Sequence, residues 1–276
     1  MAFADLTSGV RGNSIVVTGA AGGIGSAVAE LAAQMGATVV AVDRPGVDFA
    51  GLRTALSAAN SSNSGGKEGR GKKLLSADHQ FISADLTDLK THTDFFDRAR
   101  EVAPAGGQFS GLVHAAAIMR RRNNVMDITE DDWDQQNNVN LRASFFLNRT
   151  AWQAFEAQGC GGSIVNFASQ GWWTGGFGGS VAYAATKGGI VSMTRGLAGS
   201  FAPSVRVNAL APGGISTEMY HAGLDEAGHQ AFLKQIPLGR LGDPAEIAGP
   251  ALFLISDAAS YMTGTVLNVS GGQLSY

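Results

Sequence analysis

Tyr183 and Lys187 stand four residues apart in the segment AYAATKGGI (182–190) and could act together in proton transfer. Residues at this spacing face each other on a helix. A phenol is a poor base at neutral pH, but a neighbouring ammonium stabilises its anion and so lowers its pKa. The pair is therefore suited to moving one proton to or from a substrate oxygen. An isolated pair of this kind also fits a surface tyrosine lying on a lysine stem, so the rest of the chain must decide.

A glycine-rich segment, TGAAGGIG (18–25), joins an apolar run to a helical stretch. Its glycines Gly19, Gly23 and Gly25 allow positive φ and let the backbone approach a ligand closely. The helix that follows offers free N–H groups and the positive end of its dipole, which together suit a pyrophosphate. The spacing is a variant of the strict G-x-G-x-x-G pattern, and glycine-rich turns of this kind also occur for packing reasons alone.

An acidic residue supports the phosphate interpretation. Asp43 ends the run VVAVD, 18 residues after Gly25, where a carboxylate would hold the hydroxyls of an adenosine ribose. Because a carboxylate there repels a 2′-phosphate, the sequence favours NAD over NADP. Arg44 is the opposing signal, since it could clamp a phosphate, but Gly22 provides no second cation. The alternative for Asp43 is a turn residue after a strand.

Apolar runs alternate with helical stretches along the whole chain. Strands are predicted at 14–20, 38–44, 80–86, 111–118, 162–169, 204–213 and 264–272, and helices include 25–36, 129–157, 182–201 and 244–256. Near-continuous apolar strands separated by helices indicate a parallel sheet that is covered on both faces. The predicted fold is α/β, a single doubly wound, Rossmann-type domain over 1–276. The polar segment 57–76 is predicted to be a mobile surface loop, and about 218–240 a substrate lid.

Composition excludes several classes of protein. The chain has 276 residues, 45% of them hydrophobic, and a net charge of −3, which argues against a nucleic-acid partner. The lone Cys160 excludes an intramolecular disulfide and a cysteine metal cluster, so no metal is expected. No run reaches the roughly 18 apolar residues of a membrane span, and no leader pattern opens the chain. A cytoplasmic protein is therefore predicted.

The motifs, taken in order, resemble the short-chain dehydrogenase/reductase family over nearly the whole chain. They are TGAAGGIG, ADL (84–86), NVNL (138–141), SIVNFAS (163–169), YAATK (183–187), VNALAPGGISTEM (207–219) and the SGG near the end. The resemblance implies a dehydrogenase or ketone reductase that uses NAD, with NADP less favoured, on a small-molecule secondary alcohol or ketone. It also implies a homotetramer or homodimer that pairs through the helix at 182–201.

The resemblance implies four catalytic residues. Ser169 would bond the substrate oxygen, Tyr183 would pass the proton, Lys187 would hold the nicotinamide ribose, and Asn140 would anchor a water that links Lys187 to solvent. Residues expected to contact the cofactor are Gly19, Gly23, Ile24, Gly25, Asp43, Arg44, Asp85, Leu86, Ala115, Ala116, Tyr183, Lys187, Pro212, Gly213, Ile215 and Thr217.

One segment departs from the family pattern. The family usually has Asn-Asn-Ala-Gly where this chain has His114-Ala115-Ala116-Ala117. We interpret His114 as a structural residue that could bond backbone across the sheet, and the alternative is a catalytic role.

The resemblance implies that the segment QGWWTGGFGG after Ser169 lines the substrate cleft, and its aromatic side chains would make that cleft apolar. Together with Ser169, the expected substrate contacts are Trp172, Trp173, Phe177 and Met219. Such a cleft favours an aryl, alicyclic or steroid-like body over a sugar, whose hydroxyls would lose hydrogen bonds. The alternative is that these side chains pack on one another or across a subunit interface.

Three consecutive arginines, 120–122, leave further alternatives open. They could attract a carboxylate, a phosphopantetheine or an acyl carrier, as in a 3-oxoacyl-(acyl-carrier-protein) reductase. The favoured interpretation is a solvated loop beside the acidic TEDDWD (129–134), where Thr129 would cap a helix.

The competing functional classes are an epimerase or dehydratase on the same scaffold and an NAD-sensing binding protein without turnover. The complete catalytic set disfavours the sensor, and epimerases of this kind are usually longer chains.

Overall fold

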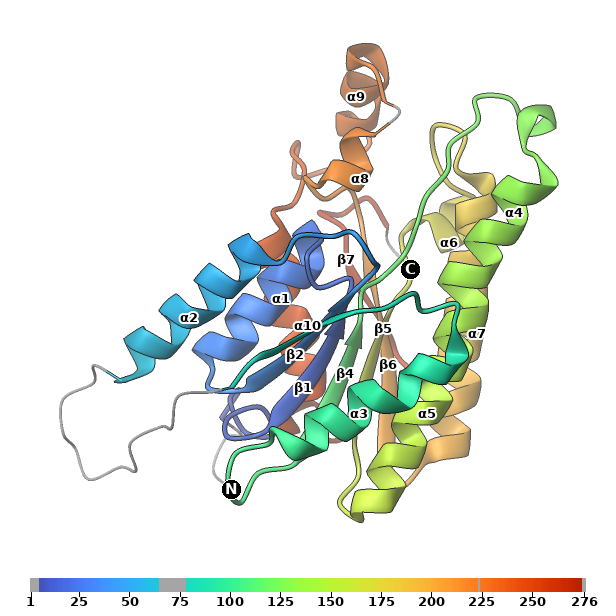
Figure 1. Ribbon diagram of the computed structural model, residues 1–276. Helices are drawn as coiled ribbons and strands as arrows, with labels where there is room; N and C mark the ends of the chain where they lie inside the picture. The colour runs from blue at the N-terminus through green and yellow to red at the C-terminus, as the bar shows by residue number, and fades with distance from the viewer. Residues whose placement is uncertain (1–4, 65–77, 223, 275–276) are drawn as a thin grey trace.

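The computed structural model describes residues 5–64, 78–222 and 224–274, and its centre is a parallel sheet. The strand order is β3-β2-β1-β4-β5-β6-β7 (Figure 1). The strands are β1 (Ser14–Thr18), β2 (Thr38–Asp43), β3 (Gln80–Ser83), β4 (Phe109–His114), β5 (Gly162–Phe167), β6 (Val205–Pro212) and β7 (Val266–Val269). All five residues of β1 are buried, because helices cover both sides of the sheet. The predicted α/β doubly wound, Rossmann-type fold is confirmed.

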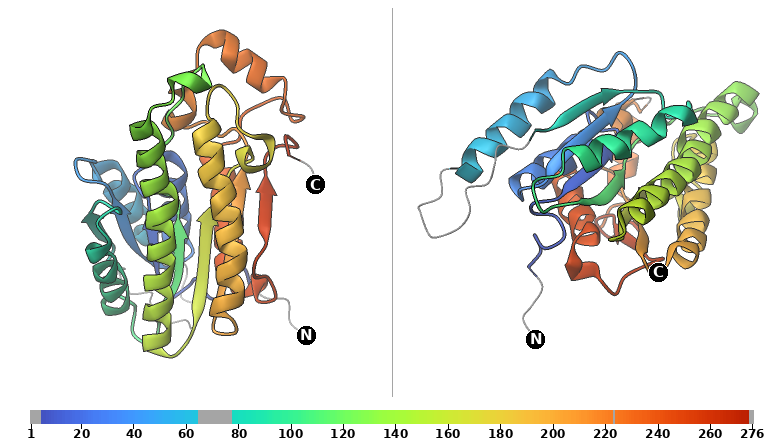
Figure 2. Two further views of the ribbon diagram at one scale, coloured as in Figure 1. Left: turned by 90° about the vertical axis from the view of Figure 1, so that its right-hand side faces the viewer. Right: turned by 60° about the horizontal axis from the view of Figure 1, so that its bottom comes forward.

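Helices form a layer on each face of the sheet (Figures 1 and 2). One layer contains α1 (Gly23–Gln34), α2 (Ala50–Ser64) and α10 (Pro244–Ile255), and the other contains α3 (His92–Glu101), α5 (Ala143–Gln158) and α7 (Val181–Phe201). Each layer buries its own apolar cluster against the strands. None of the described helices is long and apolar enough to span a membrane.

The order of the strands fixes where a ligand can bind. The chain leaves β1 for β2 on one side and reaches β4 on the other, so the order reverses between β1 and β4. Ligands of open α/β sheets bind at such a point, in the crevice beyond the carboxyl ends of the strands. The short helices α6 (Gly171–Thr174), α8 (Glu218–His221) and α9 (Glu226–Leu233) follow the ends of β5 and β6, and α8 and α9 rise above this edge in Figure 1.

The predicted helix at 129–157 contains an interruption. It consists of α4 (Glu130–Asn137), a π-helical turn at Asn138–Arg142, and α5. Thr129 caps α4 as predicted, and its side chain and that of Asp132 form a capping box. π turns inside α-helices often mark functional sites. Short 3₁₀ turns lie at Leu89–Thr91, Val125–Asp127 and Asp257–Ala259.

The predicted loop at 57–76 is wrong over its first part. Helix α2 continues to Ser64, so residues 57–64 are helical. The Leu52 and Leu56 side chains are buried and anchor this helix, and a helix that has already formed extends easily into polar sequence. Residues 65–76 lie outside the described part of the chain.

Candidate active site

The glycine segment after β1 packs so closely that side chains have no room. A Cβ on Gly25 would lie 2.0 Å from the Gly19 carbonyl oxygen, and one on Gly19, whose φ is +67°, would lie 2.8 Å from Ala116 Cα. A Cβ on Gly23 would lie 2.7 Å from Thr217 Cγ2. The turn therefore brings the segments after β4 and β6 beside the start of α1. These residues fit a dinucleotide, because the loop leaves backbone N–H groups as the ligand-facing surface.

Asp43 lies at the end of β2 and ties that strand to the glycine segment. One carboxylate oxygen accepts a hydrogen bond from Ala21 N at 2.9 Å, and the other accepts from Arg44 N at 2.8 Å. Each carboxylate oxygen can accept two hydrogen bonds, so capacity for ribose hydroxyls remains. Asp43 is thus more than a turn residue, because it positions the loop expected to hold the phosphates. The Arg44 side chain is exposed beside it.

The other expected cofactor residues surround the same crevice. Asp85 is exposed and accepts hydrogen bonds from the backbone and side chain of Thr87, both at 2.8 Å. Leu86 buries its side chain in the core, so only its backbone can face an adenine. Half-buried residues at the crevice are Ile24, Ala115, Ala116 and Gly213, whereas Pro212 and Ile215 are buried. Thr217 caps α8.

Ser169, Tyr183 and Lys187 meet beyond the end of β5. Ser169 follows β5 and hydrogen-bonds the side chain of Tyr183, which lies in the first turn of α7. Lys187 Nζ is 5.3 Å from the centroid of the Tyr183 ring and donates to the Phe167 carbonyl at 2.7 Å. The structure therefore places the predicted phenol, ammonium and hydroxyl together.

Burial favours the neutral form of both the Tyr183 phenol and the Lys187 amine, so it shifts their pKa values in opposite directions. It raises the pKa of Tyr183 to about 12, while the Ser169 hydrogen bond and the charge of Arg121 act in the opposite direction. Lys187 is only 3% exposed, and this burial lowers its pKa to about 7. Desolvation penalises charge on either group, so tyrosinate forms here only with help from nearby positive charge.

Asn140 lies in the π turn and holds the segment that follows β4. Its side-chain amide accepts from Ile118 N at 2.8 Å and donates to Ile118 O at 2.9 Å. It also donates to Thr186 Oγ1 at 3.2 Å, and Thr186 in turn donates to the Tyr183 carbonyl at 2.7 Å. Asn140 is thereby connected to the turn of α7 that lies between Tyr183 and Lys187. Its role as a water anchor stays a prediction.

His114 forms a buried chain of hydrogen bonds that the sequence does not reveal. Its Nδ1 is 2.7 Å from Thr18 Oγ1, and its Nε2 is 2.6 Å from Ser144 Oγ, which donates to the Asn140 carbonyl at 2.6 Å. Since Ser144 donates to the carbonyl, it accepts from Nε2–H, and Thr18 donates to Nδ1. Burial lowers the pKa of His114 to about 3, so the ring is neutral. His114 is structural, as interpreted, but it bonds side chains and not backbone.

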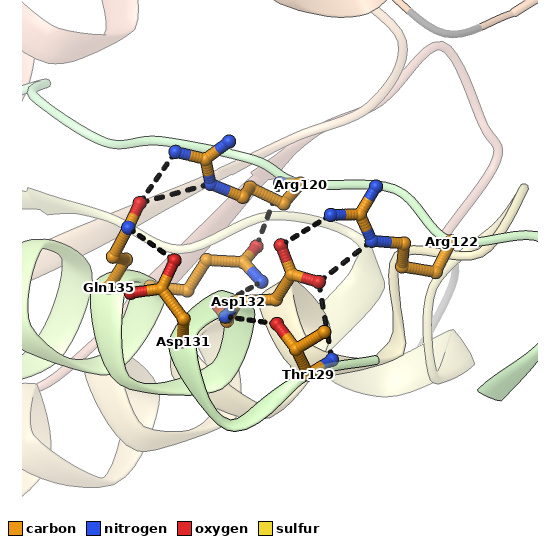
Figure 3. A network of polar contacts seen from close by, with 7 residues as sticks. Arg120, Arg122, Thr129, Asp131, Asp132 and Gln135 are labelled. Carbon is orange, nitrogen blue, oxygen red and sulfur yellow. Dashed lines mark hydrogen bonds and ion pairs between the residues drawn. The ribbon is translucent and has the colours of Figure 1, made fainter. Parts of the chain in front are cut away.

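Of the three arginines at 120–122, Arg120 and Arg122 both reach side chains of α4 (Figure 3). Arg122 forms a two-point ion pair with Asp132 of α4, at 2.7 and 2.8 Å, and the Arg120 guanidinium donates to Gln135. For these two, the expected loop beside acidic 129–134 is observed. Arg121 is different: it is half-buried, and its charge acts on both Tyr183 and Tyr220. A solvated loop is therefore the wrong description for Arg121.

The expected substrate residues occupy two kinds of position. Phe177 packs against Phe232 of α9, with ring centroids 5.2 Å apart, in an apolar cluster that includes Tyr220. Trp172 packs inward against the cluster beneath α7, whereas Trp173 beside it is 60% exposed. Met219 is half-buried in α8. Several of these side chains thus pack on one another, which was the alternative to a substrate contact.

Comparison with known proteins identifies close relatives of the chain. Residues 19–273 match the family model described as enoyl-(acyl carrier protein) reductase. The chain is 30% identical to the 2-dehydro-3-deoxy-D-gluconate 5-dehydrogenase of Dickeya dadantii, over 97% of this chain and 98% of that protein. It is 34% identical to the 3-oxoacyl-(acyl-carrier-protein) reductase of Aquifex aeolicus, over 95% of this chain and 98% of that protein.

Solved structures show the same architecture over the full chain. A short-chain dehydrogenase/reductase, glucose/ribitol dehydrogenase, from Brucella melitensis superposes with a TM-score of 0.78 at 33% identity, covering 98% of this chain and 99% of that one. A protein described as a 2-deoxy-D-gluconate 3-dehydrogenase, from Agrobacterium tumefaciens and with bound NADP, gives a TM-score of 0.80 at 32% identity, covering 98% of each chain.

Proposed function

Because this chain belongs to the short-chain dehydrogenase/reductase family, we propose that it transfers a hydride between NAD(H) and a secondary alcohol or ketone with a bulky apolar body. The oxidoreductase class follows from the family. The choice of cofactor and the nature of the substrate are the proposal. The observation that carries it is the Ser169–Tyr183–Lys187 cluster, which lies at the carboxyl edge of the sheet beside a glycine loop with no room for side chains.

The three side chains have distinct roles in the proposed reaction. Tyr183 takes the hydroxyl proton when the alcohol is oxidised and returns it when the ketone is reduced. Ser169 bonds the same substrate oxygen and the Tyr183 side chain, so it fixes the distance between them. Lys187, when charged, opposes the burial that holds the pKa of Tyr183 at about 12. Bound nicotinamide supplies the hydride acceptor or donor.

Asp43 supports NAD as the cofactor. Its carboxylate lies at the end of β2 with both oxygens bonded to the backbone, so it cannot easily turn away from a 2′-phosphate. Solved relatives with bound NADP make the opposite choice a real alternative. The ratio of kcat/KM for the two cofactors decides between them.

Aromatic and aliphatic side chains support an apolar substrate body. Phe177 packs with the buried Tyr220 and Phe232 in one apolar cluster, and Trp173, nearby in sequence, is 60% exposed. The names of the relatives point to other substrates, among them sugar acids and acyl-carrier thioesters. A 3-oxoacyl-(acyl-carrier-protein) reductase is the second candidate, but Arg120 and Arg122 are already engaged with α4, which weakens a basic docking site for a carrier.

A homotetramer or homodimer is also part of the proposal. On α7, Gly189 packs against Leu141 of its own chain, whereas nothing lies within 4 Å of a Cβ placed on Gly188. Phe145 of α5 and Val181 of α7 are 40% and 45% exposed. These exposed positions support association through α5 and α7. Sedimentation as a clean monomer at micromolar concentration would contradict it. A cytoplasmic location stays a prediction.

The test is a substrate panel monitored at the absorbance band of reduced nicotinamide. Aryl and cyclic ketones and their alcohols are compared with hexoses and with an acyl-carrier thioester, each with saturating NAD(H) or NADP(H). We expect the apolar ketones to give the highest kcat/KM, with NADH. Higher values for sugars or for the thioester would overturn the substrate assignment. Tight NAD binding without turnover of any compound would favour a sensor.

A further inference from the structure

Arg121 is a half-buried cation that lacks the partners such a group normally has. Its Nε is buried and has no hydrogen-bond partner among the described residues. Among the described residues, its guanidinium makes one hydrogen bond, a 3.5 Å contact from a terminal nitrogen to the Phe177 carbonyl. Burial lowers its pKa, and the groups that counteract this are Tyr220 and Tyr183 and not a carboxylate. Burying an unpaired charge is unfavourable, so its retention needs a reason.

Arg206 shows what a structural arginine looks like in the same protein. It is also half-buried, and its guanidinium donates to the backbone carbonyls of Leu254, Ile255 and Ser256 at 2.9–3.1 Å. Its five N–H donors are therefore largely used within the fold. The guanidinium of Arg121 has no comparable set of acceptors among the described residues. Its N–H groups are therefore available to a bound molecule.

The position of Arg121 places these donors at the catalytic site. Its charge acts on the side chain of Tyr183, the proposed proton carrier, and on that of Tyr220 in α8. A Cβ on Gly178, whose φ is +60°, would lie 3.2 Å from one terminal nitrogen of Arg121 and 3.3 Å from Leu224. The guanidinium thus lies between the loop after β5 and the segment after α8.

We propose that the substrate carries a carboxylate and that Arg121 binds it, so that the enzyme acts on a hydroxy acid and the corresponding keto acid. A guanidinium matches the two oxygens of a carboxylate with two parallel hydrogen bonds. A phosphate ester would use the same chemistry, but it carries a second charge, and the neighbouring cations Arg120 and Arg122 face α4. Arg121 is the one arginine of 120–122 without a side-chain contact to α4 among the described residues, and its single charge favours a carboxylate. The proposal rests on the hydride transfer proposed above.

The test uses matched pairs of acids and methyl esters. Apolar hydroxy acids with the hydroxyl two, three or four carbons from the carboxyl group are compared with their esters and with the phosphate ester of a matching diol. We expect the best acid to exceed its ester in kcat/KM by about 100-fold, which corresponds to about 2.7 kcal/mol at 1.36 kcal/mol per tenfold. Preference for the phosphate ester, or equal rates for acid and ester, would overturn the proposal.

Variants separate a binding role from a structural one. Arg121→Gln should reduce the acid-to-ester ratio by about 100-fold, mainly through KM, because the carboxylate is bound equally in the ground and transition states. Arg121→Lys should restore part of the ratio. Arg120→Gln removes an exposed charge that contacts Gln135, and it should leave the ratio unchanged. A ratio that Arg121→Gln does not alter is incompatible with the proposal.

A binding measurement keeps the inference separate from the hydride-transfer proposal. Titration of acid and ester into the protein with NADH, followed by tryptophan fluorescence, reports binding without turnover. If no compound is turned over but the acid binds more tightly than the ester, and Arg121→Gln removes the difference, the hydride-transfer proposal fails and the carboxylate site stands. If alcohols are oxidised but acid and ester bind equally, the carboxylate site is refuted.

Discussion

Replacing Lys187 with Met should stabilise the unliganded protein at neutral pH while it removes activity. Lys187 is 3% exposed, and burial lowers its pKa from 10.5 to about 7. The difference corresponds to about 5 kcal/mol at 1.36 kcal/mol per pKa unit. Methionine has a similar length and no charge, so it avoids this penalty. It also leaves the Phe167 carbonyl without its donor, which costs about 1–3 kcal/mol.

The dependence on pH gives this prediction its sign. Between pH 7 and 10.5 the unfolded chain keeps a proton on Lys187 that the folded chain has lost, so wild-type stability rises with pH. Below about pH 7 the full penalty applies, and the Met variant should be more stable by about 2–4 kcal/mol. At pH 9 the remaining penalty is about 2 kcal/mol and cancels the lost hydrogen bond. The advantage of the variant should therefore vanish near pH 9 and reverse above it.

The assay is thermal unfolding without cofactor at pH 6.5, 8 and 9.5. One protomer concentration is used throughout, because association would itself raise Tm. A gain of 2–4 kcal/mol corresponds to roughly 5–10 °C in Tm. Lys90→Met is the control, since Lys90 is exposed and its substitution should leave the difference in Tm independent of pH. A Lys187→Met variant that melts below wild type at pH 6.5 would falsify the argument from burial.

Single substitutions at Tyr183, Asp43 and His114 test the other groups of this site. Tyr183→Phe should abolish turnover and leave NAD binding nearly intact, as measured by titration, because it removes one hydroxyl away from the glycine loop; substantial residual rate would refute the proton-transfer role. Asp43→Ala should narrow the ratio of kcat/KM for NAD to that for NADP, because it removes the repulsion of the 2′-phosphate, and an unchanged ratio would show that Asp43 does not set the choice. His114→Ala should destabilise the fold by about 1–3 kcal/mol or more in urea unfolding, because the buried Thr18 hydroxyl loses its acceptor and the buried Ser144 hydroxyl loses its donor; an unchanged unfolding free energy would contradict the buried chain.

The glycine loop is predictable from sequence because close approach restricts the residue type. A Cβ on Gly25 would lie 2.0 Å from a carbonyl oxygen, so only glycine fits there and its presence in the sequence indicates the tight turn. The buried strands are predictable for a related reason. A strand covered on both faces, such as β1, must be apolar at nearly every position, and helices between such strands leave few topologies.

The directions of the three arginines are not predictable in the same way. Arg120, Arg121 and Arg122 are the same residue type in consecutive positions, so composition and spacing cannot distinguish them. The neighbouring helix α4 distinguishes them: Arg120 donates to Gln135 and Arg122 pairs with Asp132. Arg121 contacts neither residue and lies toward the site. Only the packing of α4 against residues 118–122 provides that information.

The π turn and the end of α2 are missed because sequence patterns average over a window. One extra residue in the turn at Asn138–Arg142 hardly changes the apolar periodicity of a long helix, although it aims Asn140 at Ile118. In α2, the serine- and asparagine-rich composition after residue 56 indicates a loop. The first half of the helix is packed against the core, however, and helical structure propagates from it into the polar second half.

The residues proposed for proton transfer and those proposed to contact the substrate are held in different ways, and this bears on how the substrate should be assigned. Lys187 is fixed by the end of β5, and Asn140 holds the segment after β4, so the proton-transfer groups rest on the sheet and on α7. Arg121 and Phe177 lie instead on the segments after β4 and β5, which contact α9 and the region after α8. Loops can change sequence without disturbing the sheet, so the same proton transfer can serve different substrates. Arg121 is therefore better evidence for the substrate of this chain than the catalytic motif, which the family shares.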